Sequence, residues 1–253
     1  MLWKLLVAFL TFFSRPFEGP VPSYDSAASG PQTWEDTVEA MEALHSEEGD
    51  MRFAPGFHEA GIKDPRYRWP NKTIPYYIHP SISGMTPLIE KAINQYHEKT
   101  IIRFVKRTNE RNYVFMFKDV GCYSYVGRVG GAQKLSLGNG CNYVGTIVHE
   151  LGHALGLYHE HQRSDRDEYI NVYLQNVIVN QTHNFKKTEH SKELIFTSYD
   201  YSSIMHYGEY AFSKKFGKLK TMEAKNGTPL KEPYHRPGLN QNDIKMVNEL
   251  YKK

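Results

Sequence analysis

Cysteine is scarce in this chain: only Cys122 and Cys141 occur in 253 residues. Their spacing is not the Cys-x-x-Cys arrangement of a zinc knuckle, so a metal site of that kind is excluded. The sequence also has no internal repeat and no long low-complexity run. With 40% hydrophobic residues, a chain of this length can form one domain of ordinary size together with extra segments.

Long hydrophobic runs are missing as well, because the apolar run at residues 5–13 is far shorter than the roughly 20 residues that cross a bilayer. The run follows a positive charge at Lys4, which is the pattern of a secretory signal peptide. We therefore expect a secreted, extracellular protein with no stable membrane span and a signal peptide at residues 1–17, cleaved between residues 14 and 28. In a secreted chain the two cysteines are candidates for one disulfide, whose roughly 20-residue loop would contribute about 3 kcal/mol.

Charge is unevenly distributed along the chain. Residues 18–59 hold ten acidic residues and one basic residue, a net charge of −9, whereas residues 60–253 hold 28 basic and 18 acidic residues, a net charge of +10. Because opposite charges favour association, we predict an acidic propeptide at residues 18–59 that docks on a basic domain at residues 60–253. The basic residues are scattered and form no known nucleic-acid module, so we expect no nucleic-acid partner.

Three histidines and a glutamate carry the main chemical signal, in the pattern His149-Glu-x-x-His153-x-x-Gly-x-x-His159. His149 and His153 are four residues apart, so on a helix both imidazoles lie on one face and can bind the same metal ion. Glu150 leaves such a helix at a different angle, which suits a base acting on water better than a third ligand. Gly156 tolerates the left-handed conformation that ends a helix, so the chain can turn and present His159.

The pattern predicts one Zn²⁺ bound by three neutral imidazoles, with an open position where the pKa of bound water falls to about 7. With 12 histidines in the chain, any single histidine is more often a surface or packed side chain than a ligand. The pattern, however, fixes five positions within a stretch of helical apolar spacing, which chance rarely produces. A zinc hydrolase that acts on something other than peptides is an alternative that the motif disfavours.

This motif is the metzincin signature, and with Glu160 after the third histidine it resembles the astacin family of zinc endopeptidases. The segment Ser203-Ile-Met-His-Tyr207 is similar to the Met-turn of that family, and the resemblance extends from about Trp69 to the C-terminus. It implies an α+β, two-lobed protease with an N-terminal mixed sheet plus two long helices, zinc in the central cleft, and a largely irregular C-terminal lobe ending in a helix. We expect a monomer that acts on extended peptide or protein substrates.

The resemblance also implies roles for single residues. Met205 would lie beneath the zinc site, and Tyr207 would hydrogen-bond the developing oxyanion. Zinc and Glu150 would activate a water that attacks the scissile carbonyl, and Glu150 would then pass its proton to the leaving amine. Residues 66–70 and 163–167 are similar to arachnid venom members of the family. The alternative is a non-catalytic secreted binding or venom protein that retains the fold, but the presence of Glu150 and Tyr207 argues against it.

A further implication of the resemblance is a zymogen that its own propeptide inhibits. In the family, the aspartate of a Phe-x-Gly-Asp motif binds the zinc; Asp50 matches the Gly-Asp half, and Glu47 stands in place of the phenylalanine. The other interpretation of Gly49-Asp50 is a turn in an acidic linker. The mature domain would begin at Ala60, and its freed amino group would join Glu160, because a buried carboxylate needs a partner.

Apolar spacing predicts helices at residues 33–45, 86–100 and 241–251, and strands at residues 73–79 and 112–118. By the resemblance, residues 122–125 form an exposed edge strand that pairs with extended peptides of many sequences. The glycine-rich loop at residues 121–141 lacks the pattern of a phosphate-binding loop.

The resemblance supports a disulfide between Cys122 and Cys141, and it exposes one departure from the family. A second disulfide is usual, but its positions are Ile101 and Lys253 here, so we expect packing alone to hold the C-terminal helix. Asn-x-Thr sequences in a secreted chain are candidate glycosylation sites, and they begin at Asn71, Asn180 and Asn226.

Overall fold

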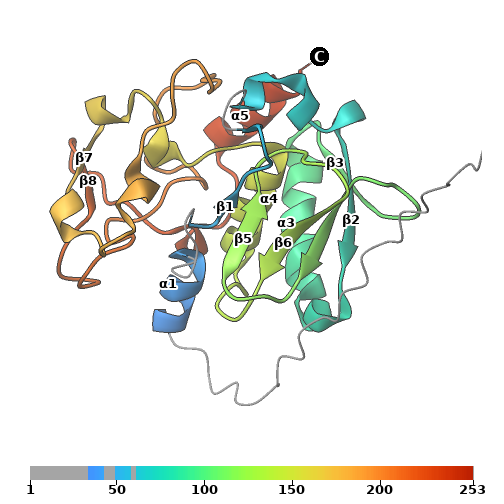
Figure 1. The fold of residues 1–253 in the computed structure, drawn as a ribbon, viewed down its shortest axis with the longest axis horizontal. Coiled ribbons are helices and arrows are strands. Elements are labelled where there is room, and N and C mark those ends of the chain that lie inside the picture. Colours follow the sequence, from blue (N-terminus) through green and yellow to red (C-terminus); the bar gives the residue numbers. More distant parts are fainter. Residues whose placement is uncertain (1–33, 43–48, 58–60, 253) are drawn as a thin grey trace, which may run out of the picture. The chain divides into compact units, whose positions relative to one another are not determined.

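The computed structural model describes residues 34–42, 49–57 and 61–252, all within one compact unit, Gln32–Lys253 (Figure 1). The expected signal peptide, Glu47 and the expected mature start at Ala60 lie outside the described residues, so those expectations stay predictions. Among the helices that are described, none combines the length and apolar character needed to cross a bilayer.

A six-stranded mixed sheet forms the first half of this unit, with its strands in the order β1-β5-β6-β4-β2-β3 (Figure 1). Strand β2 pairs in parallel with β3 and β4, β4 pairs in parallel with β6, and β5 runs antiparallel to β6. The predicted strands at residues 73–79 and 112–118 are confirmed. The bounds are β1 Met51–Arg52, β2 Thr73–Ile78, β3 Arg103–Lys106, β4 Tyr113–Phe117, β5 Cys122–Tyr125 and β6 Ala132–Leu137.

Two helices that pack on each other lie against one face of the sheet: α3 (Thr86–Lys99) and α4 (Val144–Leu155). In α3, the buried Ile89, Ile93 and Tyr96 recur at the three- and four-residue spacing that places side chains on one helix face. α4 is buried along nearly its whole length, so it forms the centre of the unit and can hold polar side chains away from water.

The chain after α4 is mostly irregular. It contains one small antiparallel pair, β7 (Ile170–Val172) with β8 (Met222–Ala224), and ends in the helix α5 (Gln241–Leu250). The side chain of Asn240 accepts the backbone N–H of Asp243, and the carboxylate of Asp243 accepts the N–H of Asn240 in return, which fixes the start of α5. The predicted α+β architecture, with an irregular C-terminal region ending in a helix, is confirmed.

The region before residue 60 contributes the helix α1 (Trp34–Glu42) and the strand β1. β1 runs parallel to β5, and the backbone N–H groups of Ser124 and Val126 donate to the carbonyl oxygens of Asp50 and Arg52, both at 2.9 Å. The expectation of an exposed edge at residues 122–125 is therefore wrong for this structure, because the chain's own N-terminal region covers that edge.

The disulfide between Cys122 and Cys141 is confirmed, with a Cα–Cα distance of 5.8 Å. It joins β5 to the segment that leads into α4, and both cysteines are fully buried. The bridge therefore ties the strand next to β1 to the central helix.

Hydrogen bonds hold the C-terminal helix in addition to packing, so the expectation of packing alone is wrong. The hydroxyl of Tyr251 donates to the carbonyl oxygen of Leu155 (2.9 Å) and accepts the backbone N–H of Trp69 (3.4 Å). The side chain of Asn248 accepts the N–H of Ile101 (2.9 Å). In the family, a second disulfide usually joins the position of Ile101 to the C-terminal end of the chain. Here the hydrogen bond between Ile101 and Asn248 links the same two parts.

Replacing Tyr251 by phenylalanine removes the hydroxyl without opening a cavity. The carbonyl oxygen of Leu155 and the N–H of Trp69 would lose a buried partner, so the free energy of unfolding should fall by about 1 to 3 kcal/mol. Urea denaturation followed by tryptophan fluorescence measures the change, with Tyr77→Phe at an exposed tyrosine as the matched control. Equal midpoints for Tyr251→Phe and the wild-type chain would contradict this role of the hydroxyl.

Candidate metal centre

α4 carries the first two histidines of the motif and ends where the chain must turn toward the third. His149 and His153 are fully buried, with ring centroids 4.5 Å apart. The helix stops at Gly156, whose φ of 103° is left-handed, and a Cβ at this position would overlap the side chain of Ile62. Glycine is required for both reasons, and the turn that it permits brings His159 back beside the other two rings.

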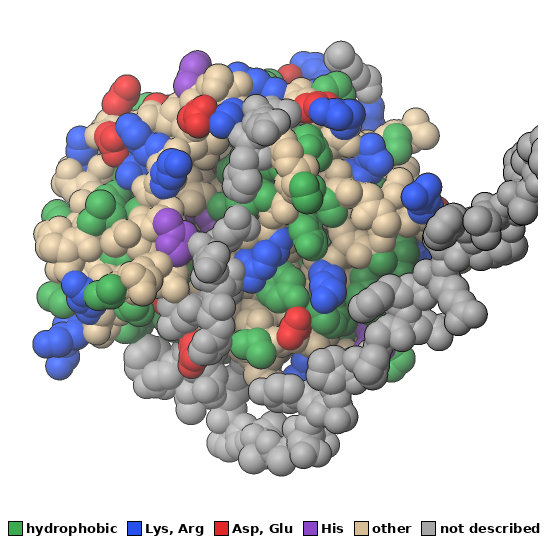
Figure 2. Space-filling view, in the orientation of Figure 1, with side chains coloured by type: hydrophobic (Ala, Val, Ile, Leu, Met, Phe, Trp, Pro, Cys, Tyr) green, Lys and Arg blue, Asp and Glu red, His purple; other side chains and the backbone are tan. Residues whose placement is uncertain are grey.

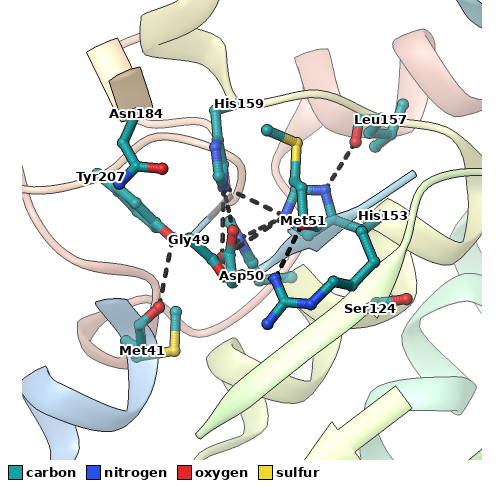
Figure 3. Close-up of polar contacts among 12 residues, drawn as sticks. Met41, Gly49, Asp50, Met51, Ser124, His153, Leu157, His159, Asn184 and Tyr207 are labelled. Carbon is teal, nitrogen blue, oxygen red and sulfur yellow. Dashed lines mark hydrogen bonds and ion pairs between the residues drawn. The ribbon is translucent and has the colours of Figure 1, made fainter. Parts of the chain in front are cut away.

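The three imidazoles direct their Nε2 atoms at one place. Nε2 of His153 lies 3.0 Å from that of His149. It also lies 3.2 Å from Nε2 of His159 (Figure 3). The Nδ1 atoms of His149 and His153 bond the carbonyl oxygens of Ile204 and Leu157, both at 2.8 Å. Because a carbonyl oxygen only accepts, these two rings carry a proton on Nδ1 and present a lone pair at Nε2. Burial lowers the pKa of both rings, which favours the neutral form.

The carboxylate of Asp50 is the fourth group at this place (Figure 3). Its Oδ2 lies 2.9 Å from Nε2 of His149, and its Oδ1 lies 3.0 Å from Nε2 of His159 without making a hydrogen bond. Burial alone would raise the pKa of Asp50, but His159 and His153 outweigh burial and hold that pKa well below its ordinary value. An ionised carboxylate therefore faces the imidazole nitrogens.

These four groups fit a zinc ion. Their ligand atoms all lie within 4.8 Å of one another, in a place closed to solvent. Lone pairs that face one another at these separations repel, and a cation removes the repulsion. Imidazole nitrogen and carboxylate oxygen are ligands that Zn²⁺ takes in four-coordinate sites. The chain thus has a zinc site formed by three histidines and one buried aspartate.

A tight turn aims Asp50 at the histidines. Gly49 has a φ of 61°, and a Cβ there would lie 2.9 Å from the side-chain oxygen of Asn184. Nη1 of Arg52 donates back to the carbonyl oxygen of Gly49 at 2.7 Å. The two interpretations of Gly49-Asp50 are therefore compatible, because the pair forms a turn and also directs its carboxylate at the metal site.

The loop that orients His149 is itself held by α5. Asp243 accepts hydrogen bonds from the N–H of Ile204 (3.1 Å) and from the hydroxyl of Ser203 (2.7 Å). Burial raises the pKa of Asp243 to about 6, although these donors oppose the rise. Met205 follows in the same loop and lies against α4, since a Cβ on Gly152 would lie 2.7 Å from its sulfur, and its expected place beneath the zinc stays a prediction.

Glu150 is fully buried beside the metal ligands, and neither of its carboxylate oxygens has a hydrogen-bond partner among the described residues. Burial first, and the charge of Asp50 second, raise the pKa of Glu150 well above its ordinary value. A buried carboxyl group without a partner is costly, so it is most often retained for chemistry rather than for stability. Glu150 is thus placed next to the metal without belonging to its ligand set.

Tyr207 packs against two of the histidine ligands. Its ring packs against His159 with centroids 4.4 Å apart, and its hydroxyl donates to the carbonyl oxygen of Met41 at 3.3 Å (Figure 3). Burial first, and then Asp50, raise the pKa of Tyr207 well above its ordinary value, so the hydroxyl stays a donor. Because Met41 belongs to α1, this hydroxyl already holds a peptide carbonyl of the chain's own N-terminal region.

Glu160, the residue that a freed amino group at Ala60 is expected to join, already has hydrogen-bond partners in this structure. Its Oε1 accepts hydrogen bonds from Nη1 of Arg163 (2.8 Å) and from the N–H of Asp200 (2.9 Å). Burial raises the pKa of Glu160 to about 7, and Arg163 opposes this rise. A contact with a new amino group at Ala60 stays a prediction, because that residue lies outside the described ones.

Several groups around the site were not predicted from the sequence. The ring of His161 stacks on Tyr207 with centroids 5.2 Å apart, and its position two residues after His159 was an available signal. Glu42 and Glu232 are both buried near the ligands but come from opposite ends of the chain. No local pattern connects the two, so only the fold could reveal them.

On the face drawn in Figure 2, lysine and arginine side chains are scattered among apolar and neutral ones rather than gathered in one stripe. The three candidate glycosylation residues Asn71, Asn180 and Asn226 are all exposed, as a glycan acceptor must be. Whether they carry glycans stays a prediction.

Comparison with known proteins relates the chain to one family. The sequence profile of the family described as Astacin, a peptidase family, matches residues 61–252. Astacin-like metalloprotease toxin 1 from Loxosceles intermedia is 42% identical over 218 residues, which cover 84% of this chain and 83% of that protein. Blastula protease 10 from Paracentrotus lividus is also 42% identical over 73% of this chain, which spans 32% of that protein's length. The solved structure of High choriolytic enzyme 1, a hatching enzyme zinc-protease from Oryzias latipes, matches with a TM-score of 0.69 and 40% identity, covering 75% of this chain and 96% of that chain.

The geometry predicts one zinc ion per chain that depends on the histidines and not on Glu150. His153→Ala removes one of three imidazole ligands, so zinc should be lost on dialysis, whereas Glu150→Gln should retain it. Elemental analysis by mass spectrometry of the full chain, with and without a chelator, measures the stoichiometry. A wild-type chain without zinc, or a His153→Ala chain that keeps it equally well, would show that the cluster is not a zinc site.

Proposed function

The chain belongs to the astacin family and is a zinc metalloendopeptidase, and from this premise we propose that it is a secreted enzyme made as a latent precursor. The observation that carries the proposal is the position of Asp50, which comes from the N-terminal region and completes the ligand set of the three histidines. A catalytic zinc site needs one open position. Removal of the N-terminal region would therefore convert a closed site into an open one.

The chemistry that follows depends on two further side chains. When bound, zinc supplies a Lewis acid that lowers the pKa of water and polarises a carbonyl group. Glu150, buried and without a hydrogen-bond partner among the described residues, accepts the proton of the attacking water and returns it to the nitrogen of the leaving amine. The hydroxyl of Tyr207 donates to the negatively charged oxygen that forms from the scissile carbonyl. Its present bond to the carbonyl oxygen of Met41 supports this role, because a peptide carbonyl is within its reach.

Extended peptides would bind along β5 once β1 has left. The backbone N–H groups of Ser124 and Val126, which now donate to β1 and to Asp50, would then be free to bond a substrate backbone. Main-chain pairing of this kind recognises an extended chain rather than one sequence. We therefore infer that substrates are extended segments of extracellular proteins.

In the latent precursor, the N-terminal region would block each part of this machinery. The carboxylate of Asp50 lies among the metal ligands, and the carbonyl oxygen of Met41 accepts a hydrogen bond from the hydroxyl of Tyr207. Strand β1 pairs with β5 and so covers its edge. A small apolar cluster adds packing, since Phe57 and Met51 are buried against Val126. The region thus acts as the chain's own inhibitor in this proposal.

Secretion is supported by two features of the chain. Residues 5–13 have the composition of a signal peptide core, and the disulfide between Cys122 and Cys141 is typical of proteins that fold in an oxidising compartment. Glycosylation at the exposed Asn71, Asn180 and Asn226 is part of the same proposal. No observation favours a non-catalytic binding protein, the alternative weighed from the sequence.

Glu150→Gln tests the assignment of the base. The amide cannot accept a proton, so the activated enzyme should lose peptide hydrolysis by about a hundredfold to ten-thousandfold while keeping its zinc. Initial rates on casein and on a quenched fluorescent peptide measure the loss, with Glu168→Gln at an exposed glutamate as the control. A zinc-loaded Glu150→Gln enzyme that cleaves at the wild-type rate would refute the assignment.

Asp50→Ala tests latency. Without the carboxylate the fourth position opens, so the uncut variant should hydrolyse the same peptide at least about tenfold faster than the uncut wild-type chain. Mass spectrometry of the assayed sample confirms that each chain is still intact. After limited proteolysis the two proteins should become equal. Equal activity before proteolysis would mean that Asp50 does not hold the enzyme latent.

Docking of the N-terminal region should weaken as the pH rises. Oε1 of Glu42 accepts the N–H of Phe212 at 2.7 Å inside the interface. Burial first, and Glu232 second, raise the pKa of Glu42 well above its ordinary value, and Glu39 adds to this. Burial also raises the pKa of Glu232 to about 7, with Arg236 opposing and Asp50 adding. A carboxyl whose pKa rises on docking stabilises the docked state at low pH, and this contribution is lost as the pH passes the raised value.

Glu42→Gln keeps an acceptor for Phe212 but cannot ionise. The activity of the uncut wild-type chain, divided by that of the activated enzyme at the same pH, should rise as the pH rises, and the rise should be smaller in Glu42→Gln, where only Glu232 still titrates. Glu98→Gln, an exposed position on α3, is the control and should follow the wild-type chain. The same rise in Glu42→Gln would contradict the assignment to this carboxyl.

A further inference from the structure

One buried carboxylate near the metal centre has no part in the mechanism above. Glu232 is 8% exposed, lies at the start of a 3₁₀ turn at Pro233–His235, and is not a metal ligand. The backbone N–H of Gly208 is its hydrogen-bond donor, and a Cβ on Gly208 would lie 2.5 Å from its Oε1. Among the described residues, no lysine, arginine or histidine nitrogen lies within ion-pair distance of it.

Arg236, four residues further along, does not supply the missing counter-ion. Its Nη2 donates to the carbonyl oxygens of Tyr201 (3.1 Å) and Lys231 (2.7 Å). The positive charge of Arg236 acts on Glu232 only from a distance beyond that of an ion pair. Within the part of the chain that the structure describes, Glu232 therefore has one neutral donor and no cation, which is an incomplete environment for a buried carboxylate.

A side chain of the N-terminal region occupies the space beside Glu232. The carboxyl of Glu42, 5% exposed, bonds the N–H of Phe212, and it is close enough to Glu232 for the two charges to interact. The charges of both carboxyls also act on Tyr234, whose ring packs against Tyr143 with centroids 5.8 Å apart. We call the place formed by Gly208, Phe212, Glu232 and Tyr234 the Glu232 subsite.

The Glu232 subsite lies next to the reacting groups. Met41, the residue before Glu42, bonds the hydroxyl of Tyr207, and the rings of Tyr207 and Phe212 are 5.8 Å apart. A peptide whose carbonyl oxygen accepts a hydrogen bond from the Tyr207 hydroxyl can therefore place the side chain of its next residue in the subsite. The N-terminal region does this with Met41 and Glu42.

We propose that Glu232 is a specificity-determining residue and that the Glu232 subsite receives a lysine or arginine side chain of the substrate. The proposal rests on the peptidase function proposed above. A carboxyl group beside a carboxylate is a poor electrostatic match, whereas an ammonium or guanidinium group supplies the missing counter-ion. The aromatic rings of Tyr143 and Tyr234 suit the long apolar stem and the charge of such a side chain. Glu42 then occupies the subsite only as long as its covalent connection keeps it there.

The test uses the full chain after activation by limited proteolysis. A peptide is hydrolysed in versions that carry lysine, glutamine or glutamate at each position around the cleaved bond in turn. At one position, kcat/KM for lysine should exceed that for glutamine by at least about tenfold, and glutamate should be the poorest. In Glu232→Gln, whose amide oxygen still accepts the N–H of Gly208, the ratio of kcat/KM for the lysine peptide to that for the glutamine peptide should fall to about one.

Glu223→Gln, a carboxylate that pairs with Lys220 away from the metal centre, is the matched control and should keep the lysine preference. Glu232→Asp retains the charge and should keep a preference for lysine as well, which separates a role of charge from a loss of fold. Cleavage without a lysine preference at any position, or an unchanged preference in Glu232→Gln, would overturn the inference and leave the peptidase function standing. An activated, zinc-loaded chain that cleaves none of the peptides would instead overturn both.

Discussion

Three imidazole nitrogens and a carboxylate meet in one place closed to solvent, and the structure around them keeps this mutually repulsive set of groups together around a cation. α4 supplies His149 and His153 at helical spacing, and the left-handed turn at Gly156 brings the third ring back. Backbone carbonyls fix the protons on the outer ring nitrogens, and Asp243 of α5 holds the loop of Ile204 that does so for His149. The C-terminal helix thus contributes to a metal site nearly one hundred residues earlier in the chain.

The same convergence would account for the latency that we propose for the uncut chain. A carboxylate at the fourth position excludes the water that a catalytic zinc site needs. Apart from Asp50 and a small apolar cluster, the contacts described for the N-terminal region are modest: a two-residue strand, one hydrogen bond from Tyr207, and a carboxyl in an unfavourable subsite. Such contacts suffice while the region is covalently attached, because attachment keeps its effective concentration high. In the proposed scheme, the region would compete as a separate molecule after a cut, and a substrate that suits β5 and Glu232 better would displace it.

Much of the fold and the metal ligands could be predicted from the sequence, because the information was local. Histidines at helical spacing, a glycine at a helix end, and alternating apolar residues at 112–118 each act within one element. The wrong expectations concerned contacts between distant parts of the chain. The hydrogen bonds of Tyr251 and the covering of β5 by β1 depend on which segments the fold brings together. For the same reason Glu232 gave no signal, since its partners in space are far from it in sequence.

Anomalous X-ray diffraction at the zinc absorption edge, from crystals of the intact chain grown with zinc, tests the central claim most directly. The account predicts a single peak about 2.0 to 2.2 Å from Nε2 of His149, His153 and His159 and from the carboxylate of Asp50. A structure without this peak, or with the ion bound by the three histidines while Asp50 points away from it, would contradict the account.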